Sequence, residues 1–165
     1  MKIIGKETIH PFLFYSGKTA GYIIWILYVT AFFELINIKM ISFVCLDYIS
    51  YCTMILGLFF IILSLINLGK STSLGLPDEK TVFIKKGLYR FSRNPMYVGM
   101  YATIIAAALY TLNPVVIVMG AFVIAVHHSI VLAEENHLQK VFGQEYVKYR
   151  NGVRRYVKVR NGQTY

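Results

Sequence analysis

Two polar segments at the ends of long apolar runs carry the side chains that could do chemistry. The first is GLYRFSRNPMYVG, from Gly87 to Gly99, and the second is EENHLQKVFGQEYVKYR, which begins at Glu134. Together they offer guanidinium groups suited to carboxylate or phosphate, carboxylates suited to hydroxyls or a cation, and tyrosine rings suited to stacking. Such polar clusters are costly beside a membrane unless they bind something. A zwitterionic, partly aromatic ligand with hydroxyl groups would match all three kinds of group.

Four apolar runs must position these segments, and they predict an all-α integral membrane protein with a single domain over residues 1–165. The chain is 56% hydrophobic and 15% charged, which is too apolar for a soluble domain of 165 residues. Most of the runs approach the roughly 20 residues that a helix needs to cross a bilayer. We predict four transmembrane helices, over about 20–38, 47–68, 95–112 and 114–141.

The turn between the last two runs fixes the relation between the polar segments. Asn113 and Pro114 read as the N-cap and first residue of a helix. Because this connection is so short, we expect the last two helices to form an antiparallel hairpin. Pro95 and Glu134 then lie about 26 and 30 Å from the turn, at the same level. The predicted pocket is formed by the loop before the third helix, the end of the fourth helix and the C-terminal tail.

The charge pattern indicates membrane topology. The chain has 17 lysines and arginines and a net charge of +9, and only Lys39 falls outside the segments assigned to one membrane face. This arrangement follows the positive-inside rule and predicts that both termini are cytoplasmic. The basic excess therefore indicates contact with anionic lipid headgroups, and we expect no nucleic-acid partner.

Several other chemistries lack their motifs. The histidines and carboxylates show no metal-ligand spacing such as HExxH, so we expect no metal site. The sequence contains no Rossmann, P-loop or GxSxG motif. His127 lies seven residues before Glu134 and shares its helix face, although a packed histidine is the more common case. Cys45 and Cys52 could pair, but unpaired buried cysteines are the more common case in an apolar helix.

The two polar segments resemble a known motif pair. GLYRFSRNPMYVG followed by EENHLQKVFGQEYVKYRNGVRRY is similar to GxYxxxRHPxYxG and EExxLxxxFGxxYxxYxxxVxR of the isoprenylcysteine carboxyl methyltransferase and phospholipid methyltransferase superfamily of membrane enzymes. The upstream LGKSTSLGLPDEKTVFIKKG also resembles the approach segment of prokaryotic members. The resemblance covers residues 68–156.

This resemblance implies S-adenosylmethionine as the methyl donor at the membrane–cytoplasm interface, with membrane lipids around it and a lipophilic acceptor entering from the bilayer of a prokaryotic cytoplasmic membrane. Glu134 is the candidate closest to both reactants, with Tyr97 and Arg154 as further catalytic candidates. The residues that the resemblance places around the cofactor are Thr81, Val82, Phe83, Ile84, Tyr89, Asn94, Pro95, Met96, Tyr97, Glu134 and Glu135.

Three positions depart from the family pattern. Asn94 stands where the family often has histidine, and it can still donate and accept hydrogen bonds. Ser73 replaces an arginine of many prokaryotic relatives. Ile130 stands where eukaryotic prenylcysteine enzymes have an arginine thought to hold the substrate carboxylate, which argues against prenylcysteine methyl esterification.

Two other functions remain open from the sequence. The C-terminal helices of NADPH-dependent sterol reductases resemble this superfamily, so a reductase is one alternative. The other is a non-enzymatic membrane protein whose basic loops bind lipid headgroups. The motifs specify neither the acceptor nor whether oxygen, nitrogen or sulfur is methylated.

Overall fold

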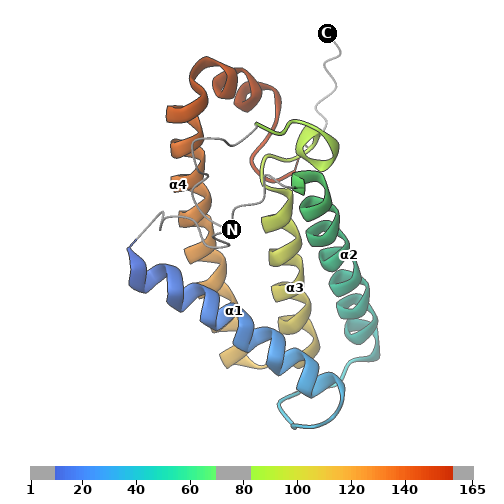
Figure 1. Cartoon of the computed structure of the whole chain (residues 1–165). Coiled ribbons are helices and arrows are strands. Elements are labelled where there is room, and N and C mark those ends of the chain that lie inside the picture. Colours follow the sequence, from blue (N-terminus) through green and yellow to red (C-terminus); the bar gives the residue numbers. More distant parts are fainter. Residues whose placement is uncertain (1–9, 70–82, 158–165) are drawn as a thin grey trace.

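The computed structural model describes residues 10–69 and 83–157, and over these ranges the chain is helical, without a strand. The described residues form four long helices and a short 3-10 helix that precedes the third of them, and Figure 1 shows their arrangement. The elements are α1 (Pro11–Phe32), α2 (Val44–Leu68), η2 (Gly87–Arg90), α3 (Pro95–Thr111) and α4 (Pro114–Gly152). Among these, α1, α2 and α4 are long and apolar enough to cross a membrane, whereas α3 is an apolar helix of 17 residues.

Helix α1 begins earlier and ends earlier than the span predicted over 20–38. It begins at Pro11 because His10 caps it, with the His10 Nδ1 atom accepting a hydrogen bond from the backbone N–H of Phe12 at 3.3 Å. It ends at Phe32, and two residues later Glu34 adopts a positive φ of 57° that no helix continues. The residues that precede the predicted span, from Pro11 onward, are therefore the first part of the helix itself.

Helices α2 and α3 lie side by side because small residues face each other across their contact. A Cβ atom added to Gly57 would lie 2.8 Å from the carbonyl oxygen of Gly99, and one added to Gly99 would lie 2.6 Å from that of Gly57. The two backbones therefore touch, as small residues allow in membrane helices. The Ser50 hydroxyl adds a buried hydrogen bond to the Ala106 carbonyl oxygen at 2.8 Å.

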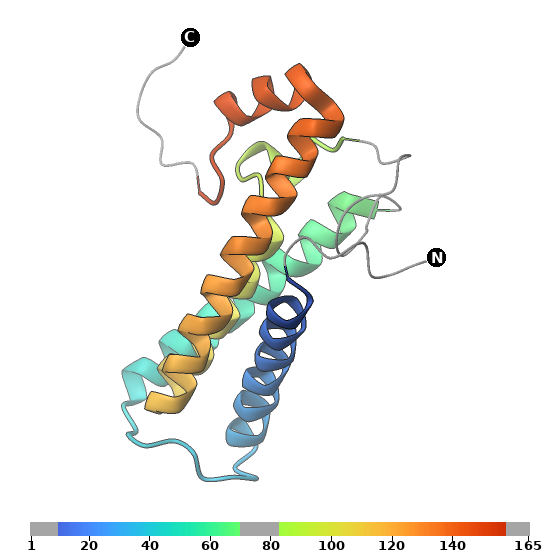
Figure 2. The same ribbon diagram turned by 90° about the vertical axis from the view of Figure 1, so that its left-hand side faces the viewer.

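Two residues separate the end of α3 from the start of α4, which returns along α3. The side chain of Asn113 caps α4 by accepting from the backbone N–H of Val115 at 2.9 Å. Gly120 packs on Ile104 of α3, and Figure 2 shows α4 continuing beyond the start of α3 before it bends. The bend lies at Gly143, whose φ of 51° and ψ of −125° are not helical.

The core lies where α1 crosses α3 and α4. Its buried members come from these three helices, and partly buried α2 residues pack against them. Two contacts hold the loop between α1 and α2 to the end of the bundle where α3 turns into α4. Lys39 of the loop forms an ion pair with Asp47 of α2 at 2.7 Å, and the Asn113 side chain donates to the Ile38 carbonyl oxygen. Cys45 and Cys52 are unpaired and exposed on α2, so the expectation that they are buried is wrong. They lie on the outward side of this helix, which packs mainly on α3.

Candidate functional site

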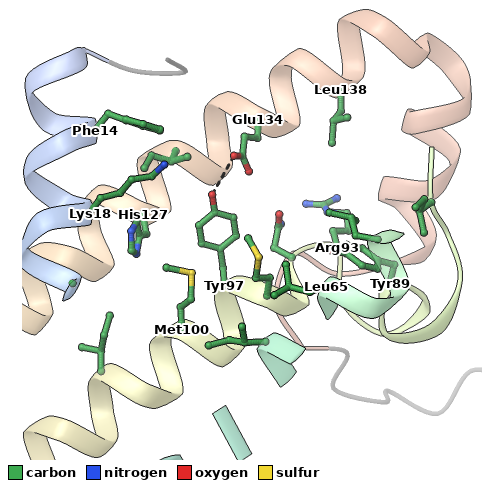
Figure 3. Close-up of a pocket in the computed structure, with 18 of the residues that line it drawn as sticks. Phe14, Lys18, Leu65, Tyr89, Arg93, Tyr97, Met100, His127, Glu134 and Leu138 are labelled. Atoms are coloured by element: carbon green, nitrogen blue, oxygen red, sulfur yellow. Dashed lines mark hydrogen bonds between the residues drawn. The ribbon is translucent and has the colours of Figure 1, made fainter. Parts of the chain in front are cut away.

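A cavity of about 410 Å3 lies between the four long helices and the segment that leads into α3. This volume is in the range of small-molecule sites. Figure 3 shows side chains from α1, α3, α4 and the loop pointing into this space. The cavity has a polar end formed by the two motif segments and an apolar floor formed by the helices.

Glu134 and Tyr97 meet at the wall of this cavity. The Tyr97 hydroxyl donates a hydrogen bond to Glu134 Oε1 at 3.1 Å, shown as the dashed line in Figure 3. Tyr97 is 9% exposed and comes from the first turn of α3, while Glu134 comes from α4. Residues 37 positions apart in the chain are therefore brought into contact by the return of α4 along α3.

Glu135 is placed differently and holds the loop and the tail to α4. Its side chain is 7% exposed. Its Oε2 atom accepts from Arg93 Nη2 at 3.1 Å and from Arg155 Nε and Nη2 at 3.1 and 3.0 Å, and its Oε1 atom accepts from Asn94 Nδ2 at 3.0 Å. The hydrogen bonds to Glu135 raise the pKa of the Arg155 guanidinium above its ordinary value. Glu135 is therefore the centre of a buried ionic network.

The C-terminal tail is hydrogen-bonded to the residues that precede α3. The backbone N–H groups of Arg93 and Asn94 donate to the carbonyl oxygens of Arg154 and Arg155 at 3.0 and 3.1 Å, and the Ser92 hydroxyl donates to Arg155 at 3.2 Å. The tail thereby holds in place the N-cap of α3, Asn94, and the first helical residues that follow it. The Arg154 side chain is exposed and does not line the cavity, so its catalytic role stays a prediction.

Aromatic rings gather at the polar end of the cavity. Phe83 stacks on Phe142 with ring centroids 5.0 Å apart and meets the edge of Tyr149 at 5.1 Å. The Tyr149 hydroxyl donates to the Tyr89 carbonyl oxygen at 2.6 Å, which joins the end of α4 to η2. Burial raises the pKa of the Tyr89 hydroxyl to about 12, and the nearby Glu134 carboxylate adds to the rise. This hydroxyl therefore stays protonated at neutral pH and remains a hydrogen-bond donor.

The floor of the cavity is apolar. It is lined by Trp25 of α1, Ile61 and Leu65 of α2, and Met100 and Ile104 of α3. The Trp25 indole N–H is satisfied by the Thr103 hydroxyl at 3.1 Å, so its ring can sit in an apolar wall without an unpaired donor. A hydrocarbon chain would fit this floor better than a polar group would.

Some of the lining was not predicted from the sequence. Helix α1 contributes Phe14, Lys18, Gly21, Tyr22 and Trp25, which repeat at helical spacing along one face. That spacing was available in the sequence, but it reads equally well as a packing face. His127 and Glu134 both line the cavity, as their spacing of seven residues predicts.

The residues predicted to surround a cofactor divide into three groups. Pro95 and Glu135 are buried outside the cavity lining. Thr81 and Val82, together with the variant position Ser73, lie outside the described residues. The residues that do line the cavity are Phe83, Ile84, Tyr89, Asn94, Met96, Tyr97 and Glu134.

Three cavity residues carry buried polar atoms with no hydrogen-bond partner among the described residues. They are the Arg93 Nε, His127 Nδ1 and Tyr146 hydroxyl atoms. Tyr146 is 1% exposed and His127 is 3% exposed. Buried polar groups are normally paired, so such atoms in a cavity wall are suited to a ligand. In the part of the chain that the structure describes, no group of three potential metal ligands occurs.

Three comparisons with known proteins each match this chain to proteins described as methyltransferases. A family model described as "Phospholipid methyltransferase" matches residues 46–145. The Protein-S-isoprenylcysteine O-methyltransferase of Saccharomyces cerevisiae is 35% identical over 77 residues, which are 46% of this chain and 32% of the yeast protein. A solved structure of the eukaryotic intramembrane Ras methyltransferase ICMT (isoprenylcysteine carboxyl methyltransferase) matches with a TM-score of 0.61 and 25% identity, over 82% of this chain and 50% of that one. The chain thus spans about a third and a half of these two proteins.

Proposed function

The chain belongs to the phospholipid methyltransferase family, and from this premise we propose that it transfers a methyl group from S-adenosylmethionine to a lipophilic or amphiphilic acceptor at the membrane–cytoplasm interface. The observation that carries the proposal is one cavity in which a polar, aromatic end meets an apolar floor at the Tyr97–Glu134 contact. The family match and three membrane-length apolar helices make the chain an integral membrane protein.

The polar end of the cavity fits the methyl donor. The rings of Phe83, Tyr89 and Tyr149 line the cavity and offer faces for the adenine. The Tyr146 hydroxyl and the Arg93 Nε atom have no hydrogen-bond partner among the described residues, and they offer donors for the hydroxyl or carboxylate oxygens of S-adenosylmethionine. When bound there, S-adenosylmethionine supplies a methyl group already activated on a sulfonium. The protein then needs mainly to align the reactants and to exclude water.

The apolar floor supports a lipophilic acceptor. Its side chains come from α1, α2 and α3, and the Tyr22 and Leu65 side chains on its edge are exposed on the outside of the bundle. An acceptor tail would bury apolar surface there, and its polar head would lie at the level of Glu134. The floor and the polar end are continuous, so the head would face the methyl donor.

Glu134 and Tyr97 lie where the polar end of the cavity meets its apolar floor. The Tyr97 hydroxyl holds the Glu134 carboxylate by a hydrogen bond. No hydrogen bond from residues 10–69 or 83–157 engages its other oxygen, which can accept a proton from the acceptor. A carboxylate acceptor needs no proton removed, whereas an amine must be deprotonated, and Glu134 lies where it would accept that hydrogen bond. We assign Glu134 as the residue that positions the acceptor.

The topology forms part of the proposal. We propose that all four long helices cross or enter the membrane with both termini on the cytoplasmic side. The distribution of lysines and arginines supports this topology. Lys39, which the sequence assigns to the other membrane face, lies in the loop between α1 and α2, where it forms an ion pair with Asp47. The cavity would then open near the cytoplasmic leaflet.

Isothermal titration of the full chain in detergent with S-adenosylhomocysteine tests the function. We expect saturable binding and none with NADPH. The Tyr146→Phe variant should bind about fivefold more weakly, because it loses one hydrogen-bond donor to the ligand, whereas the exposed Tyr15→Phe should match the wild type. Absence of binding in folded protein would contradict the proposal. NADPH binding would instead favour the reductase alternative.

A further inference from the structure

We propose that Lys18 recognises an anionic group in the head of the acceptor, so that the preferred substrate is an acidic or zwitterionic amphiphile. This inference rests on the proposed function and specifies its substrate class. The group that Lys18 would bind is a carboxylate or a phosphate beside the atom that is methylated. No residue of α1 was among the site residues expected from the sequence.

The position of Lys18 carries the inference. Its side chain lines the cavity from α1, and Figure 3 shows its amino group pointing toward the space beside Glu134 and Tyr97. The Nζ atom lies 4.0 Å from the centroid of the Phe14 ring, a cation–π contact within its own helix. Among the described residues, the ion pairs within 4.0 Å involve Lys39, Lys85, Arg93 and Arg155, and Lys18 is not among them.

A cation in this place needs a reason. A lysine in an apolar helix is costly, and it is usually found where it pairs with an anion or lines a functional cavity. Lys18 and Glu134 both line the cavity, and among the described residues no ion pair within 4.0 Å joins them. A head group with an anionic part toward Lys18 and a donor toward Glu134 would satisfy both.

A second observation points to a ligand at the same place. His127 of α4 lies next to Lys18 in Figure 3, is 3% exposed, and its Nδ1 atom has no hydrogen-bond partner in residues 10–69 and 83–157. Its ring meets Tyr97 edge to face at 5.9 Å, so packing fixes its position. A head-group oxygen or hydroxyl would complete the hydrogen bonding of this buried atom.

The floor sets the orientation of the amphiphile. Trp25 lies seven residues after Lys18 on α1, which is about 10 Å along the same helix face. A head at Lys18 therefore places the tail along Trp25 and toward Ile61 of α2. The surface changes from polar to apolar over this distance, as an amphiphile requires.

The single tryptophan of the chain provides a direct readout. Trp25 lines the cavity, so a bromine on a bound tail quenches its fluorescence. We would titrate the full chain in neutral detergent with ω-bromoundecanoate, ω-bromoundecyl phosphate and the neutral ω-bromoundecanol. The wild type should bind at least one anionic probe about tenfold more tightly than the alcohol, because a charge-assisted contact is gained. The tighter of the two anions identifies the head-group class.

Substitutions at Lys18 complete the test. Lys18→Met and Lys18→Gln should lose the anion preference, while Lys18→Arg should keep it. Lys140→Met removes an exposed lysine of α4 outside the cavity lining and should behave like the wild type. An unchanged preference in either neutral variant, or no preference in the wild type, would overturn the inference.

Titration of the same samples with S-adenosylhomocysteine separates this inference from the proposed function. Loss of the anion preference in Lys18→Met with normal S-adenosylhomocysteine binding supports both. A Lys18-dependent anion preference in a protein that does not bind S-adenosylhomocysteine would retain the head-group site and refute the methyltransferase. Binding of S-adenosylhomocysteine without any anion preference would do the reverse.

Discussion

Glu134 and Glu135 are neighbours in the chain, yet the structure gives them opposite surroundings. Glu135 accepts hydrogen bonds from two arginines and an asparagine and lies outside the cavity. Among the described residues, Glu134 accepts a hydrogen bond only from Tyr97, and it lines the cavity. Successive residues of a helix point about 100° apart, so one of the pair can face the scaffold and the other the ligand. The comparison teaches that one carboxylate builds the site and the other is left with capacity to bind.

The difference has an energetic side. Burying a carboxylate among charged donors is favourable only while all the partners are present. Removing one member leaves the other charges buried and unpaired, which destabilises the fold. A carboxylate beside a cavity keeps free lone pairs that a ligand can use. The two residues should therefore respond to substitution in different measurements.

The largest effect on folding is expected for Glu135→Ala. This variant leaves the buried Arg93 guanidinium without its carboxylate, which should reduce the free energy of unfolding by about 3–5 kcal/mol. Denaturant unfolding in detergent, followed by circular dichroism, measures it. Loss of less than about 1 kcal/mol, the size typical of exposed pairs, would show that the network is not a major support of the fold.

Substitution of the neighbour should act on the reaction. We expect Glu134→Gln to lower methyl transfer about 100-fold, since the side chain no longer accepts a proton or pairs with a cation. The free energy of unfolding should change by about 1 kcal/mol or less, because one hydrogen bond is altered. The assay is incorporation of labelled methyl from S-adenosylmethionine into a membrane lipid extract. Equal loss of stability in Glu134→Gln and Glu135→Gln would remove the distinction between them.

A smaller loss is expected where the fold depends on close helix contact and not on charge. Gly99→Ala should reduce the free energy of unfolding by about 1–3 kcal/mol, because its Cβ would lie 2.6 Å from the Gly57 carbonyl oxygen. Gly21→Ala is the matched control, since its Cβ would meet Val123 at an ordinary 3.7 Å. If both variants unfold alike, the α2–α3 contact is looser than described.

The smallest effect is expected for the exposed ion pair between Lys85 and Glu145. The Lys85 Nζ and Glu145 Oε1 atoms are 2.6 Å apart, but both side chains are exposed to solvent. Glu145→Ala should change the free energy of unfolding by about 0–1 kcal/mol, and less at high salt. The same unfolding assay at two salt concentrations checks it. A loss as large as that of Glu135→Ala would mean that burial does not explain the contrast between the two pairs.

The sequence predicted the parts of the structure that follow from local rules. Asn113 and Pro114 indicated the start of α4 through capping, and the motif segments indicated which residues meet at the cavity. The helical class followed from composition and from the lengths of the apolar runs. These features depend on residues near one another in the chain, or on a turn too short to allow another arrangement.

The remaining features depend on contacts that spacing does not reveal. The different positions of Glu134 and Glu135 follow from where Arg93 and Arg155 lie in space. The apolar run predicts a span that begins at residue 20, whereas α1 begins at Pro11, so Lys18 lies within the helix and outside the predicted span. Its place in the cavity depends on the angle at which α1 crosses α4, which a linear pattern does not contain.

Gly143 shows how one backbone angle shapes the whole binding volume. In a straight helix, Tyr146 would lie about 18 Å beyond Glu134 along the axis, too far for both to touch one small molecule. The kink at Gly143, with φ of 51°, changes the direction of α4, and Tyr146 lines the same cavity as Glu134. A single helix thus supplies two walls of the cavity, and the distance between them is set by Gly143, which is not itself a lining residue.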